Sequence, residues 1–271
     1  MKIQNYKLTE EGIDFQLSPN KSERFGNGNL DTIVIHYTAG GSRASSVKTL
    51  TNPSKKASAH LVIGRDKKIT QLVPFDTIAW HAGNSQHNNR IGLNKYSIGI
   101  EIDNAGLLSK SGDKYLSWFG KSYNEDEVIQ SVHRNQSTSK YWHSYTEWQI
   151  ETCKEICELL IEQFDIKYIL GHEEISPNRK IDPGPAFPLD KFREKIFASS
   201  RSENGEDIPI IPKTGKVTSS SLNFRIEPDV ESDKITKALP KGTLLEILEE
   251  KDGWYKVKTD IEGWVYAKHV K

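Results

Sequence analysis

The chain has 271 residues, with 37 Lys and Arg balanced by 37 Asp and Glu, so its formal net charge is zero. This balance argues against a dedicated nucleic-acid binder and against charge-driven attachment to membranes, and no apolar run approaches the ~20 residues that span a bilayer. Two cysteines are too few for a disulfide scaffold, whereas 35% hydrophobic residues suffice for the cores of about two domains.

The amino-terminal segment predicts no secretion signal. It contains no unbroken apolar stretch of roughly 7–15 residues, which a signal peptide requires. The compartment stays open, because the protein is either cytoplasmic or exported by another route to the periplasm or cell wall.

The first 197 residues combine strand-like and helix-like patterns. Apolar β-branched runs at Thr32–Ile35 and Leu61–Ile63 predict buried strands, and Ser97–Asp103 alternates as a strand with one apolar face. A long helix is predicted over Thr146–Phe164, and Tyr168–Leu170 predicts another short strand. Interleaved strands and helices are typical of an α/β domain in which helices cover a central sheet.

The predicted helix has a recognisable start and one apolar face. Thr146 followed by Gln149 forms a capping box. Apolar residues then recur at helical spacing: Ile150, Cys153, Ile156, Cys157, Leu160, Ile161 and Phe164. Buried free thiols at Cys153 and Cys157 are favoured over a metal pair, and a disulfide within one helical turn has poor geometry.

A change in composition divides the chain. Residues 198–214 are first small and polar and then rich in Ile and Pro, which predicts a linker between domains at 1–197 and 215–271. An ordered loop packed on the first domain is the alternative. Beyond the linker, short runs separated by turn signals predict a small all-β barrel or sandwich: Leu222–Ile226, Ile235–Leu239, Thr243–Leu248, Trp254–Lys258 and Trp264–Tyr266.

Ionisable residues lie in or next to the predicted buried strands. His36 ends the first strand, and Glu101 lies inside an apolar strand, where a carboxylate is costly unless it is paired or functional. His172 and Asp182 bracket a loop that contains proline. Two imidazoles and one carboxylate can form a tetrahedral zinc site with one position open for water.

Such a site would support hydrolysis. A catalytic zinc lowers the pKa of a bound water to about 7 and polarises a carbonyl group. A carboxylate such as Glu101 can take the proton of the water, and a cation such as Lys180 can hold the developing oxyanion. Because His36 lies far upstream of the other two ligands, spacing alone leaves satisfied core histidines as an alternative.

Five segments within residues 31–190 occur in the order of a known enzyme family: His36–Ala39, Ser58–Asp66, Ala79–Gly83, Ser97–Glu101 and Gly171–Gly184. Together they resemble the zinc-dependent N-acetylmuramoyl-L-alanine amidases of the type-2 family, and the carboxylate at Asp182 resembles the AmpD-like branch. Members with a cysteine as the third ligand differ at that position. The resemblance implies a central mixed β-sheet flanked by helices, with zinc in a groove on one face.

The resemblance also implies roles for individual residues. The zinc ligands would be His36, His172 and Asp182. Glu101 would act as general base, and Lys180 would stabilise the oxyanion. The bond cut would join the lactyl group of N-acetylmuramic acid to the L-alanine of the stem peptide, so the expected partner is peptidoglycan or a muropeptide.

Further residues are expected around the groove. By resemblance, sugar or peptide would be held by Trp80, His81, Asn104 and Arg179. The stretch between Glu101 and the long helix adds Trp118, Phe119, Tyr123 and Trp142, which line the groove or form a satellite core; the groove is favoured. His60 is expected to be structural rather than a fourth ligand. A solvated surface position is the default for His87, His133, His143 and His269.

Residues 215–271 resemble a bacterial SH3-like domain. The matching segments are Leu222–Arg225, Lys241–Thr243, Asp252–Val257 and Glu262–Val265. This resemblance implies a small all-β SH3-like barrel of a kind that commonly accompanies cell-wall enzymes, and it leaves the ligand of the barrel open.

A non-catalytic peptidoglycan-fragment binding protein is the alternative function, because recognition proteins share this fold and can lack a complete metal site. The presence of every expected ligand and catalytic residue favours the enzyme. The sequence leaves open whether intact wall or soluble anhydro-muropeptide is preferred, which stem-peptide lengths fit, whether the enzyme recycles wall or acts as a lysin or effector, and the oligomeric state.

Overall fold

The computed structural model describes residues 1–199, 214–251, 253–259, 262–267 and 270. The chain divides into two compact units. The first contains residues 1–123 and 130–189, and the second contains residues 124–129 and 190–271.

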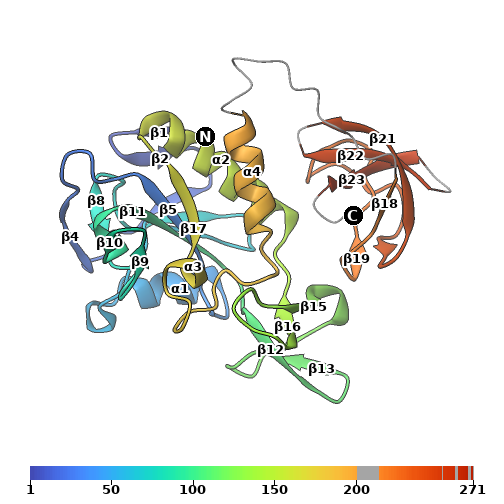
Figure 1. The fold of residues 1–271 in the computed structure, drawn as a ribbon, viewed down its shortest axis with the longest axis horizontal. Helices are drawn as coiled ribbons and strands as arrows, with labels where there is room; N and C mark the ends of the chain where they lie inside the picture. Colours follow the sequence, from blue (N-terminus) through green and yellow to red (C-terminus); the bar gives the residue numbers. More distant parts are fainter. Residues whose placement is uncertain (200–213, 252, 260–261, 268–269, 271) are drawn as a thin grey trace. The chain divides into compact units, whose positions relative to one another are not determined.

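A six-stranded sheet forms the centre of the first unit (Figure 1). Its strand order is β17-β5-β11-β6-β7-β3, with bounds Tyr168–Gly171, Thr32–Tyr37, Ser97–Ile102, Leu61–Ile63, Ile69–Gln71 and Ile13–Phe15. The pairs β17–β5, β5–β11, β11–β6 and β7–β3 are parallel, and β6–β7 is antiparallel. The expected central mixed sheet is therefore confirmed.

The strands that carry the site follow from apolar, β-branched sequence. The run at Thr32–Ile35 becomes β5, which continues two residues further to Tyr37 and so includes His36. β6 has the predicted bounds, while β11 ends one residue earlier and β17 one residue later than predicted. Both neighbours of β5 are parallel to it, so the carboxyl ends of all three strands meet at one edge of the sheet.

The alternation of β11 separates a core face from a site face. Ile98, Ile100 and Ile102 are fully buried on one face. Gly99 and Glu101 point to the other, where a Cβ at position 99 would lie 2.4 Å from the ring of His81. Only glycine leaves room for an imidazole at this distance from the strand.

Helices pack against this sheet. α2 (Glu147–Gln163) begins after the capping box of Thr146 and Gln149, as predicted, and contacts β6 and β1. Both cysteines are buried and free on its core side. α1 (Arg43–Leu50) contacts β6, and the single turn α3 (His172–Ile175) contacts β5 and β17.

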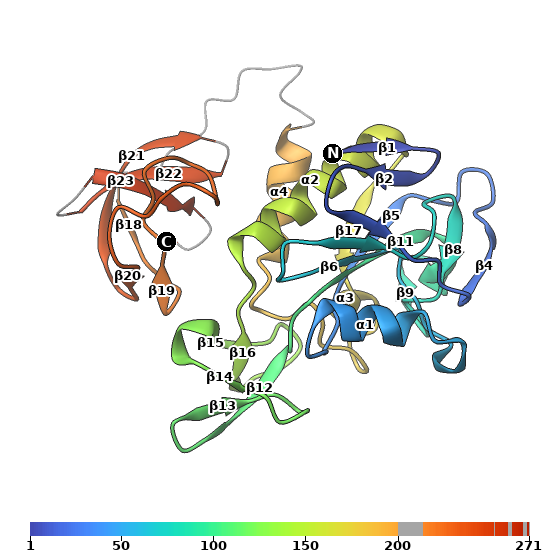
Figure 2. The same cartoon turned by 180° about the vertical axis from the view of Figure 1, so that it is seen from behind.

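A second, antiparallel sheet is inserted between β11 and α2. Its strand order is β14-β13-β12-β16-β15, with bounds Ser122–Tyr123, Lys114–Leu116, Leu107–Ser111, Ser139–His143 and Val128–Val132. Figure 2 shows the β12–β13 hairpin projecting beyond the central sheet. The sequence indicated a long stretch between the Glu101 strand and the long helix, but no pattern in it predicted these strands.

Short elements complete the first unit. Two-stranded pairs are formed by β1 (Lys2–Gln4) with β2 (Lys7–Thr9), β4 (Lys21–Arg24) with β8 (Thr77–Ala79), and β9 (Gln86–His87) with β10 (Arg90–Ile91). Single turns of 3-10 helix lie at Pro53–Lys55, Leu93–Lys95 and Glu125–Glu127.

The second unit contains the helix α4 (Leu189–Ser199, of which Leu189 belongs to the first unit) and a small all-β part. A four-stranded antiparallel sheet has the order β18-β21-β22-β23, with bounds Thr214–Lys216, Leu244–Lys251, Trp254–Lys258 and Glu262–Tyr266. β19 (Ser221–Leu222) pairs with β20 (Leu239–Pro240). These short strands agree with the predicted all-β fold.

The boundaries in this region differ in part from the predicted ones. α4 includes residues 198 and 199 of the predicted linker, and residues 200–213 of that linker lie outside the described residues. The runs predicted at Leu222–Ile226 and Ile235–Leu239 contribute only two-residue strands. β21 extends three residues beyond its predicted end, because Glu249, Glu250 and Lys251 continue to pair with β22 after an irregularity in the register.

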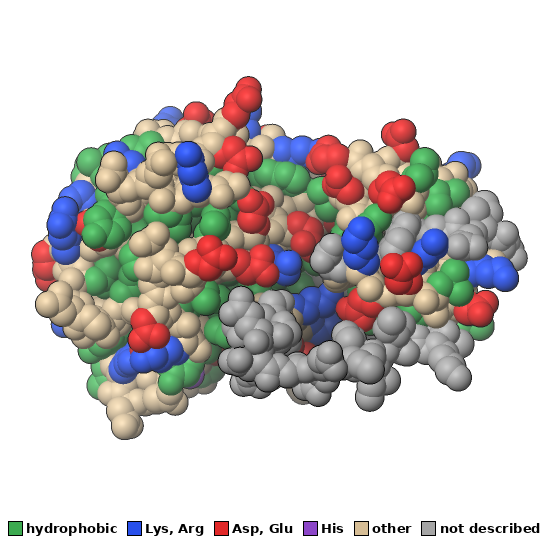
Figure 3. Space-filling model, turned by 90° about the horizontal axis from the view of Figure 1, so that it is seen from above, with side chains coloured by type: hydrophobic (Ala, Val, Ile, Leu, Met, Phe, Trp, Pro, Cys, Tyr) green, Lys and Arg blue, Asp and Glu red, His purple; other side chains and the backbone are tan. Residues whose placement is uncertain are grey.

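Two observations bear on the partner classes excluded above. Among the described residues, no helix is both long and apolar enough to cross a bilayer. On the face drawn in Figure 3, Lys and Arg side chains are scattered singly or in small groups among acidic and apolar ones, which agrees with the balanced charge of the chain.

Candidate active site

Register in the central sheet places two of the predicted functional residues side by side. His36 on β5 and Glu101 on β11 are paired neighbours in the parallel ladder. Paired residues of adjacent strands point to the same face of a sheet, so the imidazole and the carboxylate share the site face. The sequence separates them by 65 residues, and spacing alone could not reveal this pairing.

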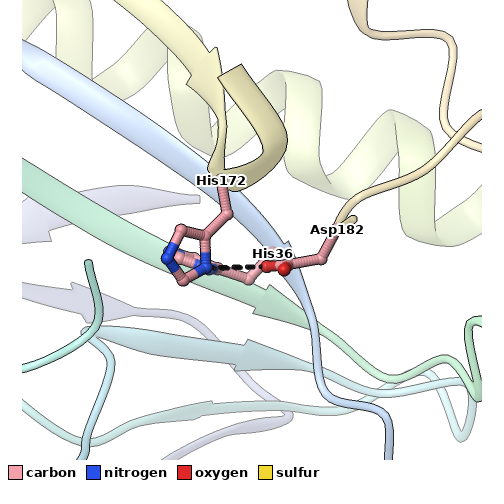
Figure 4. A group of neighbouring side chains, drawn as sticks. All are labelled: His36, His172 and Asp182. Carbon is pink, nitrogen blue, oxygen red and sulfur yellow. Dashed lines mark hydrogen bonds and ion pairs between the residues drawn. The ribbon is translucent and has the colours of Figure 1, made fainter. Parts of the chain in front are cut away.

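The other two predicted ligands follow β17, which pairs with β5 on the edge opposite to β11. His172 is the first residue of α3, directly after β17, and Asp182 lies in the loop beyond that turn. The three side chains point toward one another and are buried (Figure 4). His36 Nδ1 lies 2.9 Å from both His172 Nδ1 and Asp182 Oδ2, and His172 Nδ1 lies 3.0 Å from the same oxygen.

Hydrogen bonds at the Nε2 atoms determine the tautomers of His36 and His172. His81 Nε2 lies 3.2 Å from the carbonyl oxygen of Ser97, and His81 Nδ1 lies 3.0 Å from His36 Nε2. Since the carbonyl can only accept, His81 donates to it and accepts the Nε2–H of His36. His172 Nε2 similarly donates to the carbonyl of Ala82 at 3.1 Å. The lone pairs of both Nδ1 atoms therefore face the cluster.

This donor set fits a zinc ion. All ligand atoms of His36, His172 and Asp182 lie within 4.8 Å of one another, and ligands of tetrahedral zinc lie about 3.3 Å apart for bonds of about 2.0 Å. Burial and the neighbouring His172 lower the pKa of His36 to about 4, so its imidazole is neutral at pH 7. Burial acts to raise the pKa of Asp182, but its interactions with His172 and His36 hold this pKa well below its usual range.

Glu101 has the environment of a proton carrier. The residue is half-buried, but its Oε2 atom is inaccessible and has no hydrogen-bond partner among the described residues. Burial and the charge of Asp182 raise the pKa of Glu101 to about 8, against the lowering effect of Lys180. A carboxyl group with a pKa near neutrality can both accept and return a proton.

The raised pKa of Glu101 predicts a pH-dependent stability of the metal-free protein. The folded carboxyl keeps its proton up to about pH 8, whereas the unfolded chain releases it near the ordinary value of 4.5. The contribution of this group to the free energy of unfolding is therefore greatest below pH 4.5 and falls as the pH rises to about 8. Glu101→Gln removes this dependence.

Thermal denaturation of the metal-free wild type and of Glu101→Gln tests this expectation. The melting temperature of the variant should rise relative to the wild type between about pH 4.5 and pH 8. A difference that stays constant over this range would contradict the raised pKa.

Two cations follow α3. Lys180 is half-buried, and its ammonium acts to lower the pKa of both His36 and Glu101, in each case as a smaller effect than burial, so its charge reaches both groups. Arg179 is exposed overall, and one guanidinium nitrogen donates to the carbonyls of Ala82 and Asn84. Arg179 thereby fixes the backbone that also accepts the hydrogen bond of His172.

Comparison with known proteins identifies the family. Residues 26–185, more than half of the chain, match the family model described as N-acetylmuramoyl-L-alanine amidase. The chain belongs to this amidase family. Residues 220–271 match the model of the bacterial SH3 domain, which confirms the resemblance of the carboxyl-terminal segment.

Individual relatives agree with the AmpD-like assignment. The chain is 32% identical over 199 residues to N-acetylmuramoyl-L-alanine amidase AmiD of Escherichia coli K12, an alignment that covers 69% of this chain and 62% of AmiD. It is 35% identical over 140 residues to 1,6-anhydro-N-acetylmuramyl-L-alanine amidase AmpD of the same organism, covering 51% of this chain and 57% of AmpD. The chain thus matches about 60% of the length of these relatives.

A solved structure shows the same fold. The crystal structure of a selenomethionine AmpD derivative is 25% identical, covers 72% of this chain and 98% of its own, and superposes with a TM-score of 0.50. The mixed sheet that carries His36 and Glu101, and whose strand β17 leads directly into His172, is therefore the sheet of an amidase of this family.

The remaining residues expected at the amidase groove lie in different surroundings. Trp80 is half-buried, and its indole N–H donates to Ser22 Oγ at 2.8 Å. Asn104 is buried and uses its amide for backbone bonds to residues 106, 143 and 144. His81 is buried against His36, as described above. These three do not join the metal cluster itself.

The predicted surface position is wrong for two other histidines, and a third lies outside the described residues. His133 and His143 are buried rather than solvated, and His269 lies outside the described residues. His60 is buried, with both ring nitrogens bonded to backbone atoms of Thr77 and Gly99, which agrees with the expected structural role.

The aromatic residues of the insertion divide into two groups. Tyr123 and Trp142 are buried, as in a satellite core. Trp118 is 75% exposed, and its indole N–H donates to the carbonyl of Ala39, in the loop that follows His36. Phe119 packs edge-on against Trp118.

Proposed function

We propose that this protein is a zinc-dependent N-acetylmuramoyl-L-alanine amidase. It would hydrolyse the amide bond between the lactyl group of N-acetylmuramic or anhydromuramic acid and the L-alanine of the stem peptide. The observation that carries the proposal is the convergence of His36, His172 and Asp182 beside Glu101 in a chain of this family. The names of AmiD and AmpD state the same bond for those relatives.

In this proposal the side chains divide the chemistry. A zinc ion held by His36, His172 and Asp182 supplies Lewis acidity toward the water and the scissile carbonyl. Glu101 accepts a proton from the water as the C–O bond forms, and returns it to the leaving amine as the C–N bond breaks. The positive charge of Lys180 stabilises the oxyanion between these two steps.

The residues around the cluster are proposed to hold the substrate. The guanidinium of Arg179 can meet a peptide carboxylate while one of its nitrogens remains on the backbone. The ring of Trp80 and the exposed ring of Trp118 offer apolar surface to a sugar. His81 and Asn104 would act indirectly, since they orient His36 and hold the loop after β11.

The proposed partner is peptidoglycan or a soluble muropeptide. The bacterial SH3 match over residues 220–271 supports a wall-associated role for the second unit. Proteins with such modules commonly act on cell walls, and we propose that this unit holds wall peptide.

Product analysis tests the proposal. Intact sacculi and a soluble anhydro-muropeptide should each be incubated with zinc-loaded protein, with and without chelator, and the products identified by mass spectrometry. We expect free stem peptides that begin with L-alanine, no products with chelator, and recovery on adding zinc. The preferred substrate distinguishes wall turnover from recycling of fragments.

The alternative of a non-catalytic binding protein makes the opposite prediction. A muropeptide that binds to the zinc-loaded protein and survives prolonged incubation would overturn the amidase proposal. Cleavage that continues unchanged in excess chelator would overturn the role of the metal.

A further inference from the structure

The loop that carries Asp182 is hydrogen-bonded and packed by residues that do not belong to the metal cluster. We propose that His133 and Glu173 form a buried clamp that positions Asp182 and thereby sets the metal affinity of the site. The clamp rests on the proposed metal site, but nothing in the proposed chemistry requires it. Both are positioning residues, because neither reaches the metal or the substrate.

Glu173 contacts the chain at Asp182 and two residues beyond it. Its backbone N–H donates to the carbonyl of Asp182 at 2.8 Å. Its carboxylate atom Oε2 accepts the backbone N–H of Gly184 at 3.0 Å. Asp182 and Gly184 are thus both tied to one buried residue, Glu173, which itself directly follows the proposed ligand His172 in α3.

His133 completes the hydrogen bonding of this carboxylate. Its Nε2 lies 2.6 Å from Glu173 Oε2, and its Nδ1 accepts the backbone N–H of Asn135 at 3.1 Å. Since Nδ1 accepts, Nε2 carries the proton and donates to Glu173. The Arg134 guanidinium adds an ion pair to Glu173 Oε1 at 3.0 Å. A buried carboxylate is costly unless it is paired in this way.

Packing joins the clamp to the same loop. The indole of Trp142 stacks on His133, with ring centroids 5.6 Å apart and planes 24° apart. Trp142 also lies against Gly184, where an added Cβ would be 3.1 Å from the indole ring. Tyr145 donates from its hydroxyl to the carbonyl of Pro183 at 2.7 Å. The loop is therefore held at three successive residues, 182 to 184.

The clamp gives the inserted sheet a function at the site. His133 directly follows β15, and Trp142 belongs to β16, so the support of the Asp182 loop comes from the insertion. Metal ligands are held in position by hydrogen bonds from the residues around them. Removing one of these supporting residues typically lowers metal affinity 10–100-fold. A merely structural role would lower stability and leave the affinity of the folded protein unchanged.

Zinc affinity of the purified full chain separates these roles. The dissociation constant for zinc alone should be measured by chelator competition, without substrate, for the wild type, His133→Leu and His133→Gln. We expect affinity to fall about 10–100-fold in His133→Leu. His133→Gln should recover part of this loss, because its amide N–H can reach Glu173.

His143→Leu is the matched control. His143 is equally buried, belongs to the same insertion and accepts a hydrogen bond from the backbone of Ala105; within the part of the chain that the structure describes, its side chain makes no hydrogen bond to the Asp182 loop. Its zinc affinity should stay within about threefold of wild type, even where thermal denaturation of the metal-free proteins shows equal destabilisation. If His133→Leu does not fold, Glu173→Gln tests the same clamp, because an amide NH2 in place of either carboxylate oxygen faces at least one of the three donors from His133, Gly184 and Arg134.

Two results would overturn the clamp: wild-type zinc affinity in both His133→Leu and Glu173→Gln, or an equal loss of affinity in His143→Leu. A wild-type chain that binds no zinc would instead overturn the proposed metal site, and the clamp with it. The wild-type measurement therefore distinguishes failure of the proposed function from failure of this inference.

Discussion

Glu101→Gln is expected to retain zinc and to lose about 10²–10⁴-fold in turnover, the range typical for removal of a general base. Glutamine keeps the size of the side chain but cannot accept the proton of the attacking water. The three proposed metal ligands lie on β5, at the start of α3 and in the loop after it, and they make no hydrogen bond to Glu101 among the described residues. Zinc content should be measured on the same samples as single-turnover cleavage of a muropeptide.

Asp103→Asn is the control for this variant. Asp103 is a buried carboxylate just beyond the end of β11, two residues from Glu101, and it lies outside the metal cluster. Its turnover should stay within about threefold of wild type. Full activity in Glu101→Gln would contradict the role of general base. Loss of zinc from that variant would instead assign Glu101 to metal binding.

The architecture of the site was predictable where the strands are apolar. Thr32–Tyr37 and Ser97–Ile102 are so rich in Ile and Val that a charged residue within them indicates function. The family motifs then indicated His36, His172 and Asp182 as candidate ligands, and the structure brings these three side chains together. Spacing alone could not do so, because parallel register brings Glu101 beside His36 only after the sheet has formed.

The residues that orient the ligands were less visible in the sequence. The role of His81 depends on its hydrogen bond to the backbone carbonyl of Ser97. Since every residue has a backbone carbonyl, the side-chain pattern of the sequence does not indicate this bond. His133 follows Val132 and precedes Arg134 in a polar stretch, so a surface position was expected. Burial there results from Trp142 and Glu173, which lie 9 and 40 residues further along the chain.

The inserted sheet was missed for a related reason. β12 contains Leu107 and Leu108 and then Ser109, Lys110 and Ser111, of which only Leu108 is buried. Such a strand is stabilised by pairing with β13 and β16 rather than by an apolar face of its own. Neither alternation nor helical spacing is present, so sequence periodicity gives no signal.

Asp182→Ala is expected to abolish tight zinc binding and, with it, cleavage. Asp182 is the only charged donor of the cluster, and its Oδ2 lies 2.9 Å from His36 Nδ1 and 3.0 Å from His172 Nδ1. Its loss removes one of three ligands and leaves two imidazoles without the group that fixes their separation. The affinity for zinc should fall by more than the roughly 10–100-fold typical of supporting residues.

Replacement of Asp182 by cysteine separates loss of the ligand from damage to the loop. The backbone bond from Glu173 to the carbonyl of residue 182 does not depend on the side chain, so both variants keep it. A thiolate is a good zinc ligand at about 2.3 Å, and Asp182→Cys should therefore bind zinc far more tightly than Asp182→Ala. Unchanged metal content in Asp182→Ala would contradict the ligand assignment, whereas equal loss in both variants would assign Asp182 to the folding of the loop.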